Sequence, residues 1–218
     1  MPQLFPRRSN AIAKLCLLLI FVGPTASFLA FTYYKWSPFE TEVDMALLQP
    51  VPFSHKHHVG ELDIDCRYCH SFVEDTPFAG MPPSQTCMTC HSQIWREAPM
   101  LKPVRDSFKN STPIAWNQVY RLPNYVYFDH SIHVQKGIGC NSCHGDVARM
   151  PLTEKHRSFY MRDCLSCHRE PEQFLRPREY IFSPEYRPPE NQLMLGTKLI
   201  QDYHIHKEHL MDCYTCHR

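Results

Sequence analysis

The chain has 218 residues, a length that predicts one or two domains, and its 23 basic and 22 acidic residues leave a formal charge of +1. That balance argues against a nucleic-acid partner, which would call for a basic patch. Glycine is scarce at 7 residues, proline is common at 19, and there are 11 cysteines and 14 histidines. So many cysteines predict disulfides, metal sites or covalent cofactors, and so many prolines predict fixed turns and short elements.

An uncharged segment of 20 residues, 15–34, lies near the N-terminus. As a helix it would be about 30 Å long, which is the thickness of a bilayer core. Basic residues precede the segment and aromatic residues close its far end: Arg7, Arg8, Lys14, Tyr33, Tyr34 and Trp36. By the positive-inside rule we predict a cytoplasmic N-terminus and a single transmembrane anchor within residues 1–36. A cleaved signal peptide is the alternative, and Cys16 is interpreted as an inert apolar side chain.

After a linker at residues 37–52, residues 53–218 are expected to form one exported domain with an internal repeat. Residues 53–91 and 128–168 each contain F-x-H-x-x-H followed by two Cys-x-x-Cys-His motifs, and a truncated copy occupies residues 203–217. We expect short helices around the motifs and irregular chain elsewhere. The best strand candidate is residues 110–128, where aromatic residues alternate and Pro123 interrupts the pattern.

Ten of the eleven cysteines belong to five Cys-x-x-Cys-His motifs. The pairs are Cys66/Cys69, Cys87/Cys90, Cys140/Cys143, Cys164/Cys167 and Cys213/Cys216, and the histidines that follow them are His70, His91, His144, His168 and His217. This motif is the attachment signature of c-type haem: two thiols three residues apart bond the two vinyl groups, and the next residue presents its imidazole to the iron. The sequence therefore predicts five covalently bound haem c groups with these histidines as proximal iron ligands.

Zinc ribbons and disulfides are the alternatives for these cysteines. Seventeen residues separate Cys69 from Cys87 and twenty separate Cys143 from Cys164, both within the spacing of zinc ribbons. Two ribbons would leave the last cysteine pair unused and would not explain the five histidines. Disulfides suit an exported domain, but regularly repeated Cys-x-x-Cys pairs make a poor set of cross-links.

Histidines upstream of the motifs are candidates for the second, distal iron ligand that a six-coordinate haem needs. His55 and His58 are three residues apart, as are His130 and His133, so each pair shares one face of a helical segment. We predict that the first histidine of each pair binds the haem of the following motif and that the second reaches a neighbouring haem. The fifth iron is left with three other candidates: Met161, His209 and His206.

The repeated F-x-H-x-x-H and Cys-x-x-Cys-His pattern resembles the class III multihaem cytochromes c. With the anchor, and with the stretches YFDHSIHVQKGIGCNSCHG, FYMRDCLSCHREPE and CYTCHR, the chain looks like the pentahaem cytochrome c subunits of bacterial alternative complex III. The resemblance implies an electron relay in a quinol:electron-acceptor oxidoreductase of the bacterial inner membrane. It also implies iron–sulfur and quinol-binding membrane subunits, a further cytochrome and a soluble periplasmic electron acceptor as partners.

The expected fold is thus an N-terminal transmembrane helix plus a haem-dominated multihaem cytochrome c domain, mostly coil and short α-helices with little β. We expect no catalytic site in this chain, because all five motifs end in histidine and none of them signals an open iron, as a multihaem nitrite reductase would need. A stand-alone anchored quinol dehydrogenase feeding a periplasmic reductase is the alternative function. In that class the first motif should follow the anchor closely, whereas about 30 residues intervene here.

Overall fold

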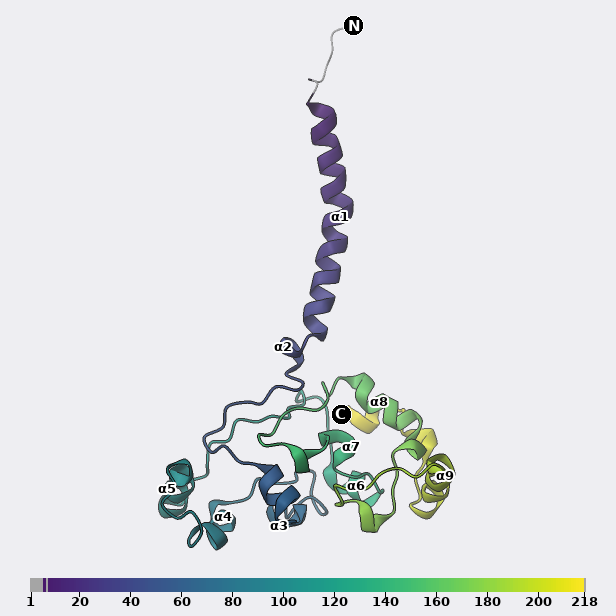
Figure 1. The fold of residues 1–218 in the computed structure, drawn as a ribbon. Helices are drawn as coiled ribbons and strands as arrows, with labels where there is room; N and C mark the ends of the chain where they lie inside the picture. The colour runs from purple at the N-terminus through teal and green to yellow at the C-terminus, as the bar shows by residue number, and fades with distance from the viewer. Residues whose placement is uncertain (1–5, 7, 218) are drawn as a thin grey trace. The chain divides into compact units, whose positions relative to one another are not determined.

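The computed structural model describes residue 6 and residues 8–217, and the chain divides into two compact units, Met1–Val43 and Asp44–Arg218. In the first unit, α1 (Ser9–Trp36) is followed by the single turn α2 (Pro38–Thr41) (Figure 1). Helix α1 continues through Pro24, and none of its side chains is buried. It is long and apolar enough to cross a membrane, so the predicted N-terminal apolar helix is confirmed.

The second unit consists of short helices joined by irregular chain. The cysteine motifs lie on α3 (Cys66–Cys69), α4 (Ser84–His91), α7 (Asn141–His144), α8 (Met161–Arg169) and α10 (Cys213–Cys216). The other helices are α5 (Lys102–Asn110), α6 (His130–Gln135) and α9 (Gln192–Asp202). A π-helical turn, η1 (Lys56–Glu61), carries the first histidine pair, and the 3-10 turns are η2 (Pro99–Leu101), η3 (Val147–Arg149), η4 (Pro171–Gln173), η5 (Arg178–Tyr180) and η6 (Lys207–His209).

Among the described residues, extended pairing is confined to two isolated bridges, Ala46 with Glu154 and Ile138 with Leu175. No strand forms within residues 8–217, and the expectation of short helices and little β is confirmed. The strand predicted for residues 110–128 is wrong. Pro113 and Pro123 remove two backbone donors from this segment, which a ladder would need.

The segment before α6 bonds the C-terminal motif instead of a neighbouring strand. Tyr127 donates its backbone N–H to the carbonyl oxygen of Cys216 at 2.8 Å, and the Tyr125 carbonyl oxygen lies 3.1 Å from Nδ1 of His217. This irregular stretch therefore ties the end of the chain to the start of α6.

The apolar core of the second unit is small. Among the described residues, ten hydrophobic ones are buried, and six of them form two clusters: Val51 with Leu101 and Val104, and Val73 with Val134 and Ile181. A chain of this length would ordinarily bury a larger continuous core. Short helices of this kind therefore need packing partners that the polypeptide itself does not supply.

Local contacts fix how the short elements approach one another. A Cβ added to Gly60 on η1 would lie 2.2 Å from the carbonyl oxygen of Ala148 on η3, so the two turns can pack only with glycine there. Gln192, at the start of α9, donates to the carbonyl oxygens of Glu172 at 2.9 Å and Leu175 at 2.8 Å. Figure 1 shows the motif helices following one another across this unit, with α4 beside α5 at one side, then α3, then α6 and α7, then α8 and α9.

Candidate haem sites

The first F-x-H-x-x-H segment is held together by its phenylalanine. Phe53 stacks on His58 with 4.4 Å between ring centroids and 24° between planes, and it meets His55 edge-on at 4.9 Å and 86°. Nδ1 of His58 donates to the carbonyl oxygen of Ser54 at 2.9 Å, and Nδ1 of His55 lies 3.0 Å from Oγ1 of Thr153. A ring whose Nδ1 carries the hydrogen keeps its lone pair on Nε2, where a metal can bind.

The second F-x-H-x-x-H segment repeats this arrangement closely. Phe128 stacks on His133 at 4.5 Å and 28°, and it meets His130 edge-on at 4.8 Å and 88°. Nδ1 of His133 donates to the carbonyl oxygen of Asp129 at 2.6 Å, and Nδ1 of His130 donates to that of Pro77 at 2.8 Å. The sequence showed the phenylalanine of this pattern but not its role, which is to orient both histidines.

Most histidines of the Cys-x-x-Cys-His motifs also carry their ring hydrogen on Nδ1. Within the described chain, four of the five direct Nδ1 at a backbone carbonyl oxygen: His70 at Gly80 (2.7 Å), His91 at Ile94 (3.1 Å), His168 at Leu210 (2.8 Å) and His217 at Tyr125 (3.1 Å). The fifth, His144, packs against the ring of Tyr120 at 4.4 Å between centroids. A hydrogen bond from Nδ1 to a carbonyl is the usual outer support of a metal-binding histidine, because it fixes the ring and leaves Nε2 free.

Three motif histidines face a histidine of the F-x-H-x-x-H segments at nearly the same separation. The centroid distances are 6.1 Å for His58 and His91, 6.3 Å for His130 and His144, and 6.2 Å for His133 and His168. Two imidazoles on opposite sides of one metal ion would have their ring centres about 6 Å apart, given a metal–nitrogen bond of about 2.0 Å. The three separations therefore suit one metal ion between each pair.

Burial favours the neutral, metal-binding form of these imidazoles. Burial, together with the neighbouring charges of His70 and His58, lowers the pKa of His55 to about 4. Burial, followed by three neighbouring histidines, also lowers the pKa of His144 to about 4. The pKa of His133 is lowered by burial as well.

None of the ten motif cysteines forms a disulfide. Two of these cysteines are exposed, Cys90 in the second motif and Cys213 in the fifth. The other eight are half-buried. Burial raises the pKa of Cys143, and it raises that of Cys167 to about 12. In the part of the chain that the structure describes, no three His, Cys, Asp or Glu side chains form a cluster that could hold a metal ion on its own, as a zinc ribbon would require.

A buried guanidinium beside the third motif provides a test of the fit to haem. Arg176 is 5% exposed, and its Nη2 donates to Oδ1 of Asn141 at 2.6 Å and to Oγ of Ser142 at 3.3 Å. Its Nε is buried without a hydrogen-bond partner, and a Cβ added to Gly139 would lie 2.2 Å from its Cζ. An unpaired buried donor on a cation suits a carboxylate, and haem carries two propionates.

A cavity of about 990 Å³ also opens beside the first motif. Its lining includes Cys66, the apolar side chains of Ile181 and Phe182, and charged side chains of both signs: Arg67, Arg178, Asp63, Asp65, Glu74, Glu179 and Glu185. The cysteine pairs, the Nε2 atoms and the unpaired guanidinium fit haem c.

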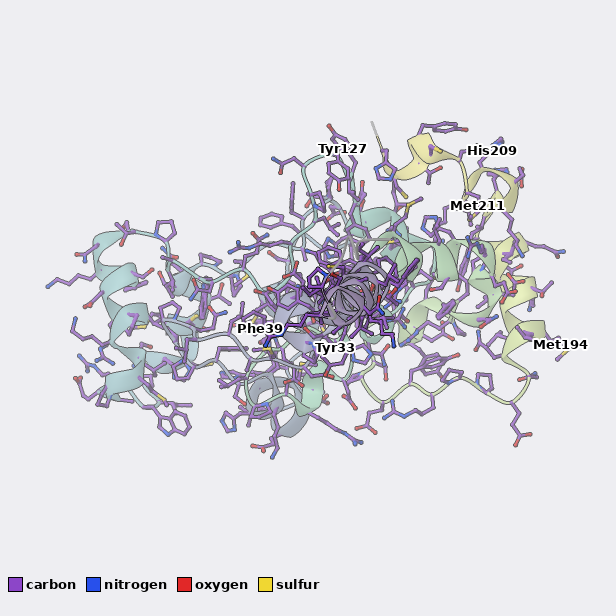
Figure 2. The ribbon with its side chains drawn as sticks, turned by 90° about the horizontal axis from the view of Figure 1, so that it is seen from above. Tyr33, Phe39, Tyr127, Met194, His209 and Met211 are labelled. Atoms are coloured by element: carbon purple, nitrogen blue, oxygen red, sulfur yellow. The ribbon has the colours of Figure 1, made fainter. Side chains whose placement is uncertain are left out.

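The three further candidates for a distal ligand are exposed. Met161 begins α8 and is 60% exposed, while the side chains of His206 and His209 are 75% and 65% exposed. Figure 2 shows His209 beside Met211 on the C-terminal segment. Among the ring contacts of the described residues, the partner of His217 is Tyr125, at 5.9 Å and 29°.

Comparison with known proteins agrees with the motifs and the geometry. The family model for cytochrome c3 matches residues 132–218. The multihaem cytochrome c subunit of a menaquinone reductase from Nitratidesulfovibrio vulgaris (strain Hildenborough) is 30% identical over an alignment of 156 residues, with 62% of this chain and 74% of the relative covered. The five Cys-x-x-Cys pairs make this a chain that carries multiple haem c groups. The protein belongs to the cytochrome c3 family of multihaem cytochromes c.

Proposed function

We propose that this chain is a five-haem electron-transfer subunit of a quinone-linked membrane oxidoreductase complex. When bound, haem c supplies a reversible one-electron couple whose potential is set by the axial ligands and their surroundings. The observation that carries the proposal is the set of three histidine pairs at 6.1–6.3 Å, each combining a motif histidine with a histidine from another segment. Two imidazole ligands leave no open position for a substrate, so these sites suit electron transfer.

The proximal ligands in this proposal are His70, His91, His144, His168 and His217. The distal ligands of the first four irons, in motif order, are His55, His58, His130 and His133. The ring separations support the last three assignments, and the mutual charge interaction of His55 with His70 supports the first. Each F-x-H-x-x-H segment thus serves two irons, which requires two haems close together.

For the fifth iron we propose Met161 as distal ligand, with His209 and His206 as the alternatives. Met161 and Cys164 are three residues apart on α8 and share one face of the helix. Burial raises the pKa of Cys164, and the nearby Cys216 of the fifth motif raises it further. The proximity of Cys164 to the fifth motif supports Met161 as the candidate. A thioether ligand would give this site a higher potential than the four histidine pairs.

Two quinone-linked complexes are candidates. The stretches that resemble alternative complex III favour a complex that takes electrons from quinol, with iron–sulfur and quinol-binding membrane subunits and a further cytochrome, and delivers them to a periplasmic acceptor. The relative from Nitratidesulfovibrio vulgaris is a subunit of a menaquinone reductase, and this similarity favours a complex that delivers electrons to menaquinone. In both cases this chain carries electrons between a quinone-binding membrane subunit and a protein outside the membrane.

We also propose that α1 is a retained anchor in the bacterial inner membrane, with the N-terminus in the cytoplasm and the haem domain in the periplasm. Its 28 residues would span about 42 Å as a helix, which is more than a bilayer core. Its exposed apolar side chains support this placement, and a signal sequence is the alternative. In this proposal residues 37–52 link the anchor to a domain at residues 53–218.

Purification of the complex from native membranes tests the proposal. We expect the chain to keep its N-terminal helix, to carry the mass of five haems, and to co-purify with quinone-binding membrane subunits. The direction of electron transfer follows from two additions. Reduction of the haems by quinol would indicate a quinol-oxidising complex, and reduction of menaquinone after addition of a periplasmic donor would indicate a menaquinone-reducing one. A lone chain that oxidises quinol would support the stand-alone dehydrogenase, and the mass of the bare polypeptide would overturn the proposal.

A further inference from the structure

The spatial order of the attachment sites differs from their order in the sequence. We infer that the five sites form one unbranched series in the order second, first, third, fourth, fifth, with the second and fifth sites as its exposed ends. The electron-carrying role of this series rests on the proposed function, whereas its order rests on the contacts between neighbouring motifs.

The second site lies next to the first. Oη of Tyr68, inside the first motif, is 2.7 Å from Oγ1 of Thr89, inside the second. His58, whose ring faces His91 of the second motif, sits three residues after His55, which interacts electrostatically with the histidine of the first. One turn of chain thus reaches both sites.

The first site also lies next to the third. His130, whose ring faces the histidine of the third motif, bonds the Pro77 carbonyl oxygen through both its backbone N–H (3.2 Å) and its Nδ1 (2.8 Å). Pro77 belongs to the loop that follows the first motif. The thiols of Cys66 and Cys140 also interact, which lowers the pKa of Cys66, so the cysteines of these two motifs are neighbours.

The fourth site connects the third to the fifth. His133 faces His168 of the fourth motif, although it is on the same helix, α6, as the histidine that faces the third. Nδ1 of His168 in turn lies 2.8 Å from the carbonyl oxygen of Leu210, three residues before the fifth motif. Burial raises the pKa of Cys164, and Cys216 and Cys143, one from each neighbouring motif, raise it further.

Exposure distinguishes the ends of the series from its middle. The two exposed motif cysteines, Cys90 and Cys213, belong to the second and fifth sites, which the contacts place at opposite ends. Figure 1 shows α4 at one side of the unit, with α3, α7 and α8 following in turn and the yellow C-terminal segment close to α7 and α8. Electrons would enter and leave such a series at its exposed ends, so partner proteins are expected to approach the second and fifth sites.

The positions of the five irons in crystals of the haem-loaded full chain, located from their anomalous scattering, test the order. We expect the first iron to be the nearest neighbour of the second, and the third iron to lie between the first and the fourth. An arrangement in sequence order, or a second iron nearest to the third, fourth or fifth, would overturn the inference. This measurement does not depend on quinone chemistry, so it separates a failure of the order from a failure of the proposed function.

Redox titration of variants that lack one attachment site provides a second test. Loss of the second site, in C87A/C90A, should shift the midpoint potential of one remaining haem, because a terminal site has one neighbour. Loss of the third site, in C140A/C143A, should shift the midpoint potentials of two remaining haems, because this site has two neighbours. Equal numbers of shifted haems in the two variants would contradict an unbranched series. If either variant fails to fold, the iron positions of the unmodified protein still decide.

Discussion

The first two copies of the histidine-rich segment and the C-terminal copy differ in what holds their histidines. In the first two, a phenylalanine packs on both rings, and a backbone carbonyl four residues earlier accepts from the second histidine. In the C-terminal copy, His206 and His209 face the carboxylates of Glu208 and Asp212 instead, and both are mostly exposed. Packed, carbonyl-bonded rings have one orientation, whereas exposed rings beside carboxylates have several. The number of histidines in a copy is therefore a poorer guide to iron ligation than the group that orients them.

Replacing a packed histidine should have the largest effect. We expect H133A to convert one low-spin haem to a high-spin haem, because its iron loses a strong nitrogen ligand while the covalent thioether bonds keep the haem in place. Electron paramagnetic resonance of the oxidised protein measures this change. The matched variant in the C-terminal copy, H209A, should leave the spectrum unaltered.

The fifth iron offers a sharper form of the same comparison. M161L should change the spectrum of one haem and lower the highest midpoint potential of the set, because a thioether ligand raises the potential. A spectral change in H209A or H206A together with an unaltered M161L would show that the C-terminal copy supplies a ligand despite its exposed rings.

Removal of the buried guanidinium beside the third motif should have a smaller but distinct effect. R176M loses hydrogen bonds to Asn141 and Ser142, which should destabilise the fold by about 2 kcal/mol. It should also lower one midpoint potential, because a nearby cation favours the reduced form of the haem. Redox titration separates this effect from simple destabilisation, and R187M, at a side chain that is 61% exposed, serves as the control. A potential that does not move in R176M would mean that this cation does not face a haem.

The sequence predicted the attachment chemistry better than the arrangement of the sites. Five Cys-x-x-Cys-His motifs indicate covalent haem because the chemistry is local, confined to five consecutive residues. The contact of Tyr68 with Thr89 joins residues 21 positions apart, and that of Arg176 with Asn141 joins residues 35 apart. Contacts at such separations cannot be predicted from a local sequence pattern. The strand predicted near Tyr125 and Tyr127 failed for the same reason: aromatic alternation suggested a sheet, but the backbone there bonds the C-terminal motif.

The phenylalanine that orients each histidine pair gives a modest stability effect. We expect F128L to lower the free energy of unfolding by about 1 kcal/mol, because leucine cannot reproduce the stacked and edge-on contacts with His133 and His130. Chemical denaturation of the haem-loaded protein measures the loss. F78L, at a ring that is 79% exposed, should change stability little. Equal losses in the two variants would mean that the histidine contacts contribute nothing beyond ordinary packing.

The N-cap of α6 completes the comparison with the smallest expected effect. Oδ1 of Asp129 accepts from the backbone N–H of Ser131 at 2.8 Å and of Ile132 at 3.4 Å, and so supports the helix that carries both histidines of the second copy. D129A should destabilise the protein by about 1 kcal/mol, because these donors lose their acceptor. Asp212 occupies the same position before α10 but makes no side-chain cap to the helix backbone, so D212A should cost less. Denaturation midpoints measured side by side decide: a larger loss in D129A would show that the cap stabilises α6, whereas an equal loss would show that it contributes no more than the hydrogen bonds of Asp212 with Tyr214 and His209.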